Sequence, residues 1–410
     1  MRIFSASFER HREAGRRQCS HDDVQSSTSE VPRVAWFLGP RTSSWNGVGQ
    51  HSLVLIRALT SRCGFQVDTI DIPAEPRSLK RYWWQFAIYP IRVFQRARSC
   101  DVVLLYQEDL SFLVPIARLA GGRVCVFVHH IRRPGQARDG VERLKSLYVR
   151  LVQPMIAKAD LVLVPSKVTA QEVLASLAIP SSRLQVVPCP FDDRYVSGID
   201  VKRSEARTRA RGILKERFGI STRDAFVLLN VGSDETRKNN VTLFRAVARL
   251  VGKDIVVVRV GAAINSANRL ECKAIAAESG VDAYFVDKVG DEDLGYFYQA
   301  ADAHVSPSLH EGFGRTVIEA QIAGIPVIAS GLEVYRETMG DSFLAINEPT
   351  NPVAWESGIA RLMSDPSLVG ELIERGKRNS VRYSSQVVGS LLRINLDRII
   401  QKVENHQPRH

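Results

Sequence analysis

Two carboxylates separated by a glycine-rich turn are the residues of this chain best suited to chemistry. Glu311 is followed directly by Gly312-Phe313-Gly314, and Glu319 lies three residues after Thr316, where we expect an amphipathic helix to begin. Glycines at a turn let backbone N–H groups approach a ligand closely, and a helix N-terminus behind them favours an anion. A sugar-nucleotide needs this division: an acceptor for the sugar hydroxyls, another for the ribose hydroxyls, and a positive helix end for the diphosphate.

Each of these carboxylates also has a purely structural explanation. Thr316 and Glu319 fit a capping box, in which the glutamate only satisfies a backbone donor. Glu311 alone is typical of a surface loop. The whole string favours ligand binding over both explanations, because an apolar strand precedes it and the helix ends at Gly324 before a second apolar strand at 326–329.

Two adjacent cations, Arg237 and Lys238, follow an expected strand at 225–231 and precede an expected helix at 241–251. Cations between a strand and a helix N-terminus suit a diphosphate leaving group. In isolation such a pair is more often part of a solvated turn. The two carboxylates elsewhere in the same series of strands make the diphosphate role the better interpretation.

Two weaker features lie nearer the N-terminus. His129 follows the apolar run 124–128, and an imidazole at the carboxyl end of a strand can hydrogen-bond a sugar hydroxyl or an acceptor; His130 is the less favoured of the pair. Gly47-Val48-Gly49 lies in the first strand–helix crossover, where backbone N–H groups can meet an anion. A lone G-x-G is weak evidence, and Ser52 in place of a third glycine disfavours a dehydrogenase.

Strands and helices alternate along most of the chain in two series. Apolar runs predict strands at 34–38, 66–70, 102–105, 124–128 and 161–164, and again at 225–231, 255–260, 283–286, 303–306 and 326–329. This alternation indicates parallel sheets with helices on both faces, which bind ligands at the carboxyl ends of their strands. We therefore predict an α/β fold of two doubly wound, Rossmann-like domains with the ligand in the cleft between them.

Length and composition fit a globular protein of two domains. The 410 residues are too many for one ordinary core, and 45% are apolar and 24% charged. The six cysteines form no C-x-x-C pair, which argues against a zinc site or a disulfide scaffold and fits a reducing cytosol. The sequence contains no apolar run long enough to span a membrane, and residues 1–30 lack the apolar segment of a secretory signal. We expect those first residues to form a mobile tail.

The positive charge is concentrated in one part of the chain. Residues 31–191 contain 21 basic and 10 acidic residues, which accounts for the whole net charge of +11, whereas residues 192–410 contain 29 of each. Within the basic part, residues 77–98 hold six basic residues and six aromatic residues but no acid. This composition suits an anionic membrane surface, and single-stranded nucleic acid is the alternative. Equally, the aromatic side chains are candidates for the core, with the cations as a solvated rim.

The segment 306–330 resembles the E-x7-E signature of the family-4 retaining glycosyltransferases, which are group 1 glycosyl transferases with the GT-B fold. Ser-Pro before Glu311, the Glu-Gly-Phe-Gly string, Glu-Ala at Glu319 and Ala-Gly-x-Pro-Val all match. The resemblance covers residues 33–390 and implies a nucleotide-sugar co-substrate, no metal and no other cofactor. Asp291-Glu292-Asp293 looks like the D-x-D metal motif of the other main glycosyltransferase fold, but it lies at an expected helix start, where acids favour the helix dipole.

The resemblance also implies a role for each candidate residue. Glu319 would hold the donor ribose, Glu311 the sugar hydroxyls, and Lys238 the diphosphate as negative charge develops on it. The implied catalytic residues are Glu311, His129 and Lys238. The implied donor-binding residues are Gly47, Gly49, Arg237, Lys238, Glu311, Gly312, Phe313, Gly314, Thr316, Val317 and Glu319. Many members have an arginine where this chain has Ser233, so phosphate binding must depend on Lys238 and Arg237. The departing phosphate would itself act as the base toward the acceptor hydroxyl.

These expectations combine into one function. We expect a tail at 1–30, an acceptor-side domain at 31–192, a nucleotide-sugar domain at 193–383, and a helix at 384–410 that crosses back to the first domain. The protein would transfer a hexose with retention to a lipid-linked or cell-surface glycan, in the cytoplasm at the inner face of the cell membrane, without a nucleic-acid partner. Arg-Lys-Asn and the stretch 333–341 resemble members that use GDP-mannose, while a UDP-hexose stays open. The rivals are a sugar-nucleotide epimerase on the same fold and a non-enzymatic basic protein that binds membranes or nucleic acid.

Overall fold

The computed structural model describes residues 31–39, 47–74, 78–131, 147–191, 203–222, 224–250, 252–287 and 289–404. The expected tail at 1–30 and Arg77 lie outside these ranges. We refer to residues 31–191 as the N-terminal half and to residues 203–383 as the C-terminal half.

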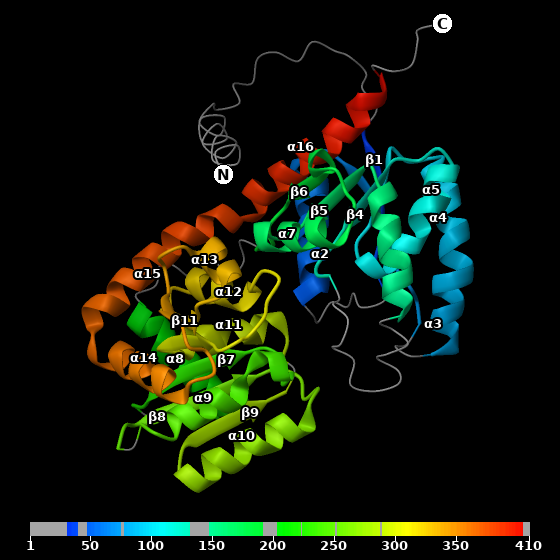
Figure 1. Ribbon diagram of the computed structural model, residues 1–410. Coiled ribbons are helices and arrows are strands. Elements are labelled where there is room, and N and C mark those ends of the chain that lie inside the picture. Colours follow the sequence, from blue (N-terminus) through cyan, green and yellow to red (C-terminus); the bar gives the residue numbers. More distant parts are fainter. Residues whose placement is uncertain are drawn as a thin grey trace, which may run out of the picture. The chain divides into compact units, whose positions relative to one another are not determined.

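The N-terminal half contains a six-stranded sheet of order β2-β1-β3-β4-β5-β6, in which all neighbours are parallel. Its strands are β1 (Arg33–Phe37), β2 (Gln66–Ile70), β3 (Val102–Leu105), β4 (Val124–Phe127), β5 (Leu161–Val164) and β6 (Leu184–Val186). Its helices are α2 (Gly47–Arg62), α3 (Leu79–Trp83), η1 (Trp84–Ile88), α4 (Tyr89–Ala97), η2 (Glu108–Leu113), α5 (Val114–Leu119), η3 (Gln153–Lys158), α7 (Lys167–Ser176) and η4 (Ser181–Arg183). The central strands are continuous apolar runs because helices cover both faces of the sheet (Figure 1).

The C-terminal half contains a second parallel sheet, of order β12-β11-β10-β7-β8-β9. Its strands are β7 (Phe226–Val231), β8 (Ile255–Val260), β9 (Asp282–Val286), β10 (Ala303–Ser306), β11 (Val327–Ser330) and β12 (Leu344–Ile346). Its helices are α8 (Arg203–Phe218), η6 (Thr236–Lys238), α9 (Asn240–Val247), α10 (Ser266–Ser279), α11 (Asp291–Ala300), α12 (Arg315–Ile322), α13 (Glu333–Met339), α14 (Pro352–Ser364), α15 (Pro366–Ser380) and η7 (Val381–Tyr383). The strand order reverses between β7 and β10, and a ligand is expected at the carboxyl ends of such a pair.

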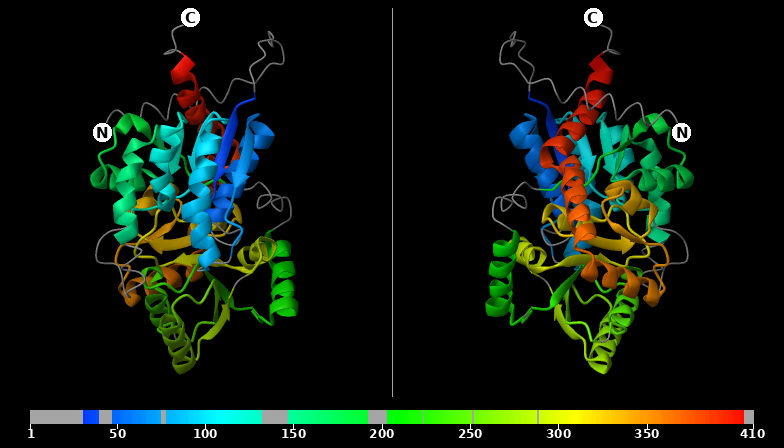
Figure 2. Two further views of the ribbon diagram at one scale, coloured as in Figure 1. Left: turned by 90° about the vertical axis from the view of Figure 1, so that its right-hand side faces the viewer. Right: turned by 90° about the vertical axis from the view of Figure 1, so that its left-hand side faces the viewer.

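The last helix, α16 (Ser385–Glu404), packs on the N-terminal half although it follows the C-terminal half in the chain (Figure 1; Figure 2, right). Val388, Leu392 and Leu396 are buried in one core cluster with Trp36 of β1 and Leu55 of α2. The contact is close, because a Cβ built on Gly389 would lie 2.7 Å from the Cβ of Ala58. Where the chain crosses, the Phe191 N–H donates to the Tyr383 carbonyl at 2.8 Å, so the outgoing and returning segments are hydrogen-bonded to each other.

The basic–aromatic segment forms α3, η1 and α4, with a π-helical turn in the middle. The Tyr89 N–H donates to the Trp84 carbonyl five residues back, directly before Pro90, whose ring has no N–H to continue the α-helical pattern. Tyr89 is fully buried, whereas Trp83 and Phe86 are 58% and 47% exposed. The aromatic residues of this segment are therefore divided between the core and the surface.

Candidate active site

Glu311 and Lys238 meet at the point where the strand order of the C-terminal sheet reverses. Lys238 lies in the loop after β7 and Glu311 in the loop after β10, and the Lys238 Nζ donates to the Glu311 Oε1 at 2.5 Å. Arg237 Nη1 donates to the Glu311 Oε2 at 3.3 Å, and Ser308 Oγ donates to Oε1 at 2.8 Å. The Leu309 N–H donates to the Arg237 carbonyl at 2.7 Å, which joins the two loops through their backbones.

The charge of Glu311 is stabilised by these neighbours. Burial by itself would raise the pKa of Glu311, but the charges of Lys238 and Arg237 and the hydrogen bonds from Lys238 and Ser308 lower it below its ordinary value. Burial likewise opposes the charge of Arg237, but Glu311 and Glu235 raise the pKa of that guanidinium. Glu311 is therefore ionised at neutral pH. Arg237 also pairs with Glu235 Oε2 at 2.6 Å, so two cations and two carboxylates meet here, and the remaining N–H groups of Lys238 and Arg237 are the donors that suit a diphosphate.

Glu319 has specific side-chain partners and does not act as a helix cap. Its Oε2 accepts from the Tyr298 hydroxyl at 2.9 Å, and its Oε1 accepts from Arg315 Nη2 at 3.3 Å. Helix α12 begins at Arg315, and its N-cap residue is Gly314, which has no side chain to cap the helix. The capping-box explanation for Thr316 is therefore wrong, because Thr316 already lies inside the first turn.

The glycine turn is held from both halves of the chain. The Gly312 carbonyl accepts hydrogen bonds from Ser166 Oγ at 2.8 Å and from Thr169 Oγ1 at 3.2 Å, both at the start of α7. A Cβ on Gly312 would lie 2.9 Å from the His129 carbonyl oxygen. Gly314 has φ +86, and a Cβ there would lie 2.4 Å from the Tyr335 ring. Both positions therefore require glycine, and the turn lies against the backbone of His129, two residues after the end of β4.

His129 is oriented by backbone and aromatic contacts. Its Nε2 lies 3.2 Å from the Tyr106 carbonyl oxygen, so Nε2 carries the proton, and its ring stacks on Phe127 with centroids 4.8 Å apart. Its backbone N–H donates to Glu108 Oε2 at 3.3 Å, and the other oxygen of that buried carboxylate lies 3.5 Å from His130 Nδ1. The half-buried His129 thus approaches the donor turn through its backbone carbonyl, while its imidazole faces the Tyr106 carbonyl and His130 faces Glu108.

Gly47 and Gly49 lie in the first turn of α2, and the loop predicted at these positions is wrong. The helix runs from Gly47, not from about His51, because the first turn tolerates glycine when its N–H groups need no intrahelical partner. These first-turn N–H groups still suit an anion. Residues 40–46, which precede them, lie outside the described ranges.

A buried ionic network supports the loop that carries Lys238. Asp234 accepts from Arg259 Nη2 at 2.8 Å and from Arg269 Nε at 2.6 Å, and both Asp234 and Arg259 are almost fully buried. A Cβ on Gly261 would lie 1.6 Å from the Gly232 carbonyl oxygen, so the loops after β7 and β8 touch through their backbones. These contacts therefore hold the loop that positions Lys238.

The sequence did not reveal several residues of this site. Tyr298 lies on α11, and nothing in its sequence context indicates that it would reach Glu319. Arg315 follows the glycine turn directly, and this position next to the turn could have indicated that it belongs to the site. Ser308 belongs to the Ser-Pro-Ser string, but its hydroxyl was not expected to bind Glu311. Asp293, in the acidic run that begins α11, pairs with Arg217 at 2.7 Å. Across the described ranges, no cluster of three or more His, Cys, Asp or Glu side chains is arranged to hold a metal.

Both halves of the chain match family models. The group described as glycosyl transferases group 1 matches residues 214–379, and the glycosyl transferase 4-like domain matches residues 38–190. The chain belongs to the family-4 glycosyltransferases. A D-inositol 3-phosphate glycosyltransferase from Salinispora arenicola is 26% identical over 59% of this chain and 56% of that protein. A 2-deoxystreptamine glucosyltransferase from Streptomyces kanamyceticus is 28% identical over 73% of this chain and 77% of its own. The alignments cover about half the length of most of these curated relatives.

The fold of this family-4 glycosyltransferase is the GT-B fold. Anabaena HepE, in a crystal structure with UDP and glucose, has a TM-score of 0.69 at 15% identity, over 90% of this chain and 100% of that one. The two six-stranded parallel sheets confirm the predicted pair of doubly wound units. No helix in the described part of the chain is long and apolar enough to cross a membrane.

Proposed function

We propose that this protein is a retaining hexosyltransferase that takes its hexose from a nucleotide-diphosphate sugar. The observation that carries the proposal is the cluster of Lys238, Arg237 and Glu311 at the reversal point of the C-terminal sheet. Family membership and the position of the glycine turn support it. Lys238, Glu311 and His129 are the proposed catalytic residues.

The donor would extend from Glu319 to Glu311. Glu319 accepts the ribose hydroxyls, and Tyr298 and Arg315 hold its carboxylate in place for them. The backbone of residues 312–314 and the start of α12, with Thr316 and Val317, line the diphosphate and sugar. Gly47 and Gly49 approach the same phosphates from α2.

The chemistry would place the developing charge next to Lys238. The bond between the anomeric carbon and the diphosphate oxygen breaks, and the acceptor oxygen bonds to the same face of that carbon. The acceptor proton passes to the departing phosphate oxygen. Lys238 has three N–H donors and only one is needed by Glu311, so it can bridge the carboxylate and the phosphate. This route requires no metal or other cofactor, and none is proposed.

Sequence features favour GDP-mannose as the donor. Arg-Lys-Asn at 237–239 supports GDP-mannose. The stretch 333–341 supports it less, because Glu337 accepts from the Lys167 and Val168 N–H groups at 2.7 and 3.1 Å and Tyr335 packs behind Gly314. UDP-hexoses are the alternative. A thermal-shift panel of GDP, UDP and ADP sugars would decide, since a ligand at 100 times its Kd adds about 2.7 kcal/mol.

The acceptor is proposed to be a lipid-linked or cell-surface glycan at the cytosolic face of the membrane. Support comes from the exposed rings of Tyr82, Trp83 and Phe86 beside basic residues of α3 and α4. The names of the two relatives described above contain D-inositol 3-phosphate and 2-deoxystreptamine, so a soluble cyclitol is the second candidate acceptor. Product formation in extracts with and without membranes, using a radiolabelled donor, separates the two.

The rival functions make different predictions for one experiment. Incubation with the donor alone gives an epimer if the protein is a sugar-nucleotide epimerase. A non-enzymatic binding protein gives no product with any donor and acceptor. A transferase releases nucleoside diphosphate in proportion to glycosylated acceptor, and the product keeps the anomeric configuration of the donor, which NMR reports. An inverted product would contradict the retaining mechanism.

A further inference from the structure

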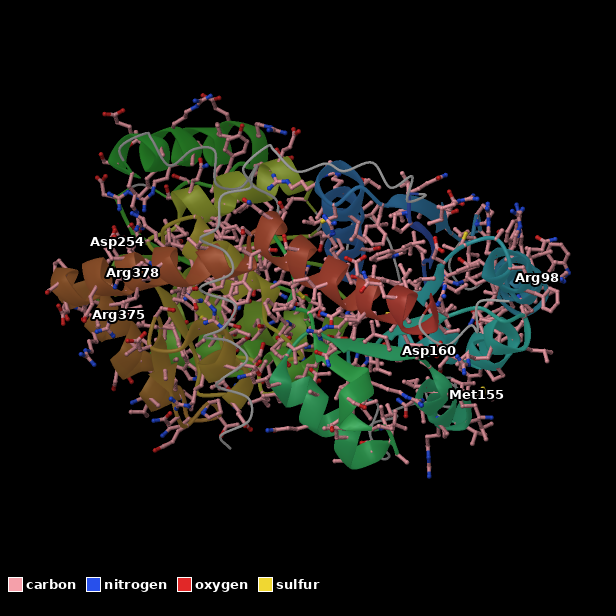
Figure 3. The ribbon with its side chains drawn as sticks, turned by 90° about the horizontal axis from the view of Figure 1, so that it is seen from above. Arg98, Met155, Asp160, Asp254, Arg375 and Arg378 are labelled. Atoms are coloured by element: carbon pink, nitrogen blue, oxygen red, sulfur yellow. The ribbon has the colours of Figure 1, made fainter. Side chains whose placement is uncertain are left out.

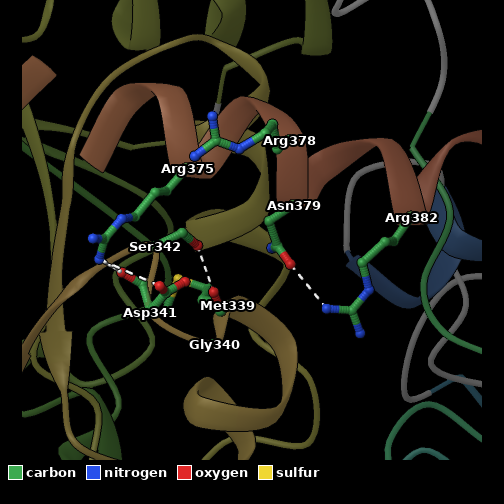
Figure 4. A pocket seen from close by; sticks show the side chains of 8 residues that line it. All are labelled: Met339, Gly340, Asp341, Ser342, Arg375, Arg378, Asn379 and Arg382. Atoms are coloured by element: carbon green, nitrogen blue, oxygen red, sulfur yellow. Dashed lines mark hydrogen bonds and ion pairs between the residues drawn. The ribbon is translucent and has the colours of Figure 1, made fainter. Parts of the chain in front are cut away.

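A second cationic site lies outside the donor-binding residues, in a pocket of about 410 Å³. The pocket lies between the turn Gly340–Ser342 and the end of α15 with η7 (Figure 4). Arg375, Arg378 and Arg382 line it, and the only lining carboxylate is that of Asp341. The charged lining residues therefore carry a formal charge of +2, whereas residues 192–410 as a whole have a net charge of zero.

The three arginines differ in how they are held. Arg375 Nη1 lies 3.3 Å from the Asp341 carboxylate and donates to the Asp341 carbonyl at 3.2 Å, and its Nη2 donates to Glu371 Oε1 on the preceding turn of α15, so Arg375 is already paired with two acids. Arg382 Nη1 donates to the Asn379 Oδ1 at 3.0 Å. Arg378 is exposed and, within the described ranges, has no hydrogen-bond or ion-pair partner. Arg375 and Arg378 are three residues apart on α15 and so share a face of the helix (Figure 3).

The wall of the pocket is continuous with the donor-binding helix. Asn379 Nδ2 donates to Gln321 Oε1 and to the Thr338 carbonyl, both at 2.8 Å. Gln321 is buried on α12, two residues after Glu319, and its Nε2 donates to Ser342 Oγ at 2.7 Å. The side-chain amides of Asn379 and Gln321 thus connect the pocket directly to α12.

A second connection leads to the glycine turn. Tyr383 follows Arg382 directly, and its ring packs edge-on against Phe313 with centroids 5.3 Å apart. The Tyr383 hydroxyl donates to the Thr338 carbonyl at 2.8 Å, so this ring is fixed between the pocket and the turn. An ion that orders Arg382 would therefore also order the support of Phe313.

We propose that this pocket binds the phosphate group of a small phosphorylated molecule, separately from the donor. Guanidinium groups match the oxygens of a phosphate in pairs, and the lining charge of +2 is opposite in sign to the charge of a phosphomonoester dianion. The volume is in the range of small-molecule sites, roughly 300–1,000 Å³, so it holds more than the phosphate alone. Arg378, which has no other partner in the described ranges, donates to the bound phosphate. Asn379 connects the occupied pocket to α12 through its hydrogen bond to Gln321.

The test uses phosphate in a protein whose donor site is disabled. In the Lys238→Ala variant, thermal unfolding is followed while sodium phosphate replaces sodium chloride at constant ionic strength. We expect phosphate to raise the midpoint temperature, with a half-saturating concentration at least about tenfold higher when Arg378→Gln is added, as the loss of one charged hydrogen bond requires. Lys377→Gln, which removes the same charge from the neighbouring position outside the pocket, should leave that concentration unchanged.

Several results would overturn the proposal. One is the same phosphate response with and without Arg378→Gln, and another is no response beyond that to chloride. If Arg378→Gln lowers the midpoint temperature in chloride but not the affinity for phosphate, the arginine only stabilises the C-terminal end of α15. Vesicles containing phosphatidic acid test the other source of phosphate. Binding to them that requires Arg378, without any response to free phosphate, would assign the pocket to a lipid headgroup and overturn the soluble ligand. None of these results depends on transferase activity.

Discussion

Replacing Lys238 by alanine is the sharpest test of the proposed chemistry. If its ammonium neutralises charge that grows on the leaving diphosphate, kcat should fall by about 10² to 10³, which is the effect of removing one preorganised donor from a developing anion. The donor Kd should rise much less, because the ground-state diphosphate keeps Arg237 and the start of α12. Initial rates at saturating donor and acceptor give kcat, and calorimetry gives the donor Kd.

The same variant should change stability in a pH-dependent manner. Lys238 donates a charge-assisted hydrogen bond of 2.5 Å to Glu311, whose loss costs about 1.5–3 kcal/mol. Arg237 and Ser308 still hold the carboxylate, so the low end of that range is expected. The pKa of Glu311 is lowered in the folded protein, so the stabilisation exists above its unfolded pKa and disappears as pH falls through the folded pKa. The stability difference from the unmodified protein should therefore be full at pH 7 and vanish in acid.

Lys253→Ala is the matched control, because Lys253 is an exposed lysine of the same half. It should change neither kcat nor the pH dependence of unfolding. An unchanged kcat with a raised KM in Lys238→Ala would mean that Lys238 only binds the ground-state donor. A stability difference of equal size at pH 7 and pH 3 would refute the ion-pair explanation.

Three further changes test other parts of the argument. Glu319→Ala should depress kcat/KM far more than it destabilises the fold, and loss of stability with full activity would return this residue to a structural role. Gly314→Ala should cost about 1–3 kcal/mol in urea unfolding, because φ +86 is strained for alanine and the Tyr335 ring blocks its Cβ, whereas Gly370→Ala, with open space at its Cβ, should not destabilise. The last prediction is that the protein binds anionic vesicles and that this binding weakens as salt is raised. Each basic residue near the vesicle surface should contribute about 1 kcal/mol to the binding free energy. The test variant replaces three basic residues of segment 78–98 by glutamine: Lys80, Arg81 and Arg92. Sedimentation should then show release from vesicles with nucleotide binding intact, and binding unchanged by these substitutions would contradict the membrane role.

The central strands were predictable because they are buried on both faces and are therefore mainly apolar. The expected bounds of 102–105, 161–164, 255–260 and 303–306 are those of the structure, although Arg259 interrupts β8 and His304 interrupts β10. The short strands β6 and β12 carry only three residues each and were missed. The start of α2 was placed too late, since glycines at 47 and 49 are typical of a loop and only the neighbouring sheet favours a helix there.

The candidate site was predictable only where chain order determines proximity. Lys238 and Glu311 follow strands that are neighbours in a doubly wound sheet, so their meeting follows from topology. The contact between Tyr298 and Glu319 depends on how α11 packs beside α12, which no local pattern determines. Ser166, which holds Gly312 from the other half, lies 146 positions away, and no local pattern predicts it.

The packing of α16 has a consequence for the order in which the protein can fold during synthesis. Val388, Leu392 and Leu396 belong to the same core as Trp36 and Leu55, yet the ribosome makes them more than 300 residues later. The N-terminal half therefore emerges first but keeps part of its apolar surface exposed until α16 is made. The C-terminal half can complete its own core before α16 is synthesised. Exposed apolar surface of this kind is prone to aggregation and attracts chaperones. Residues 31–192 expressed alone should consequently be poorly soluble, and adding the α16 sequence as a separate peptide should restore solubility.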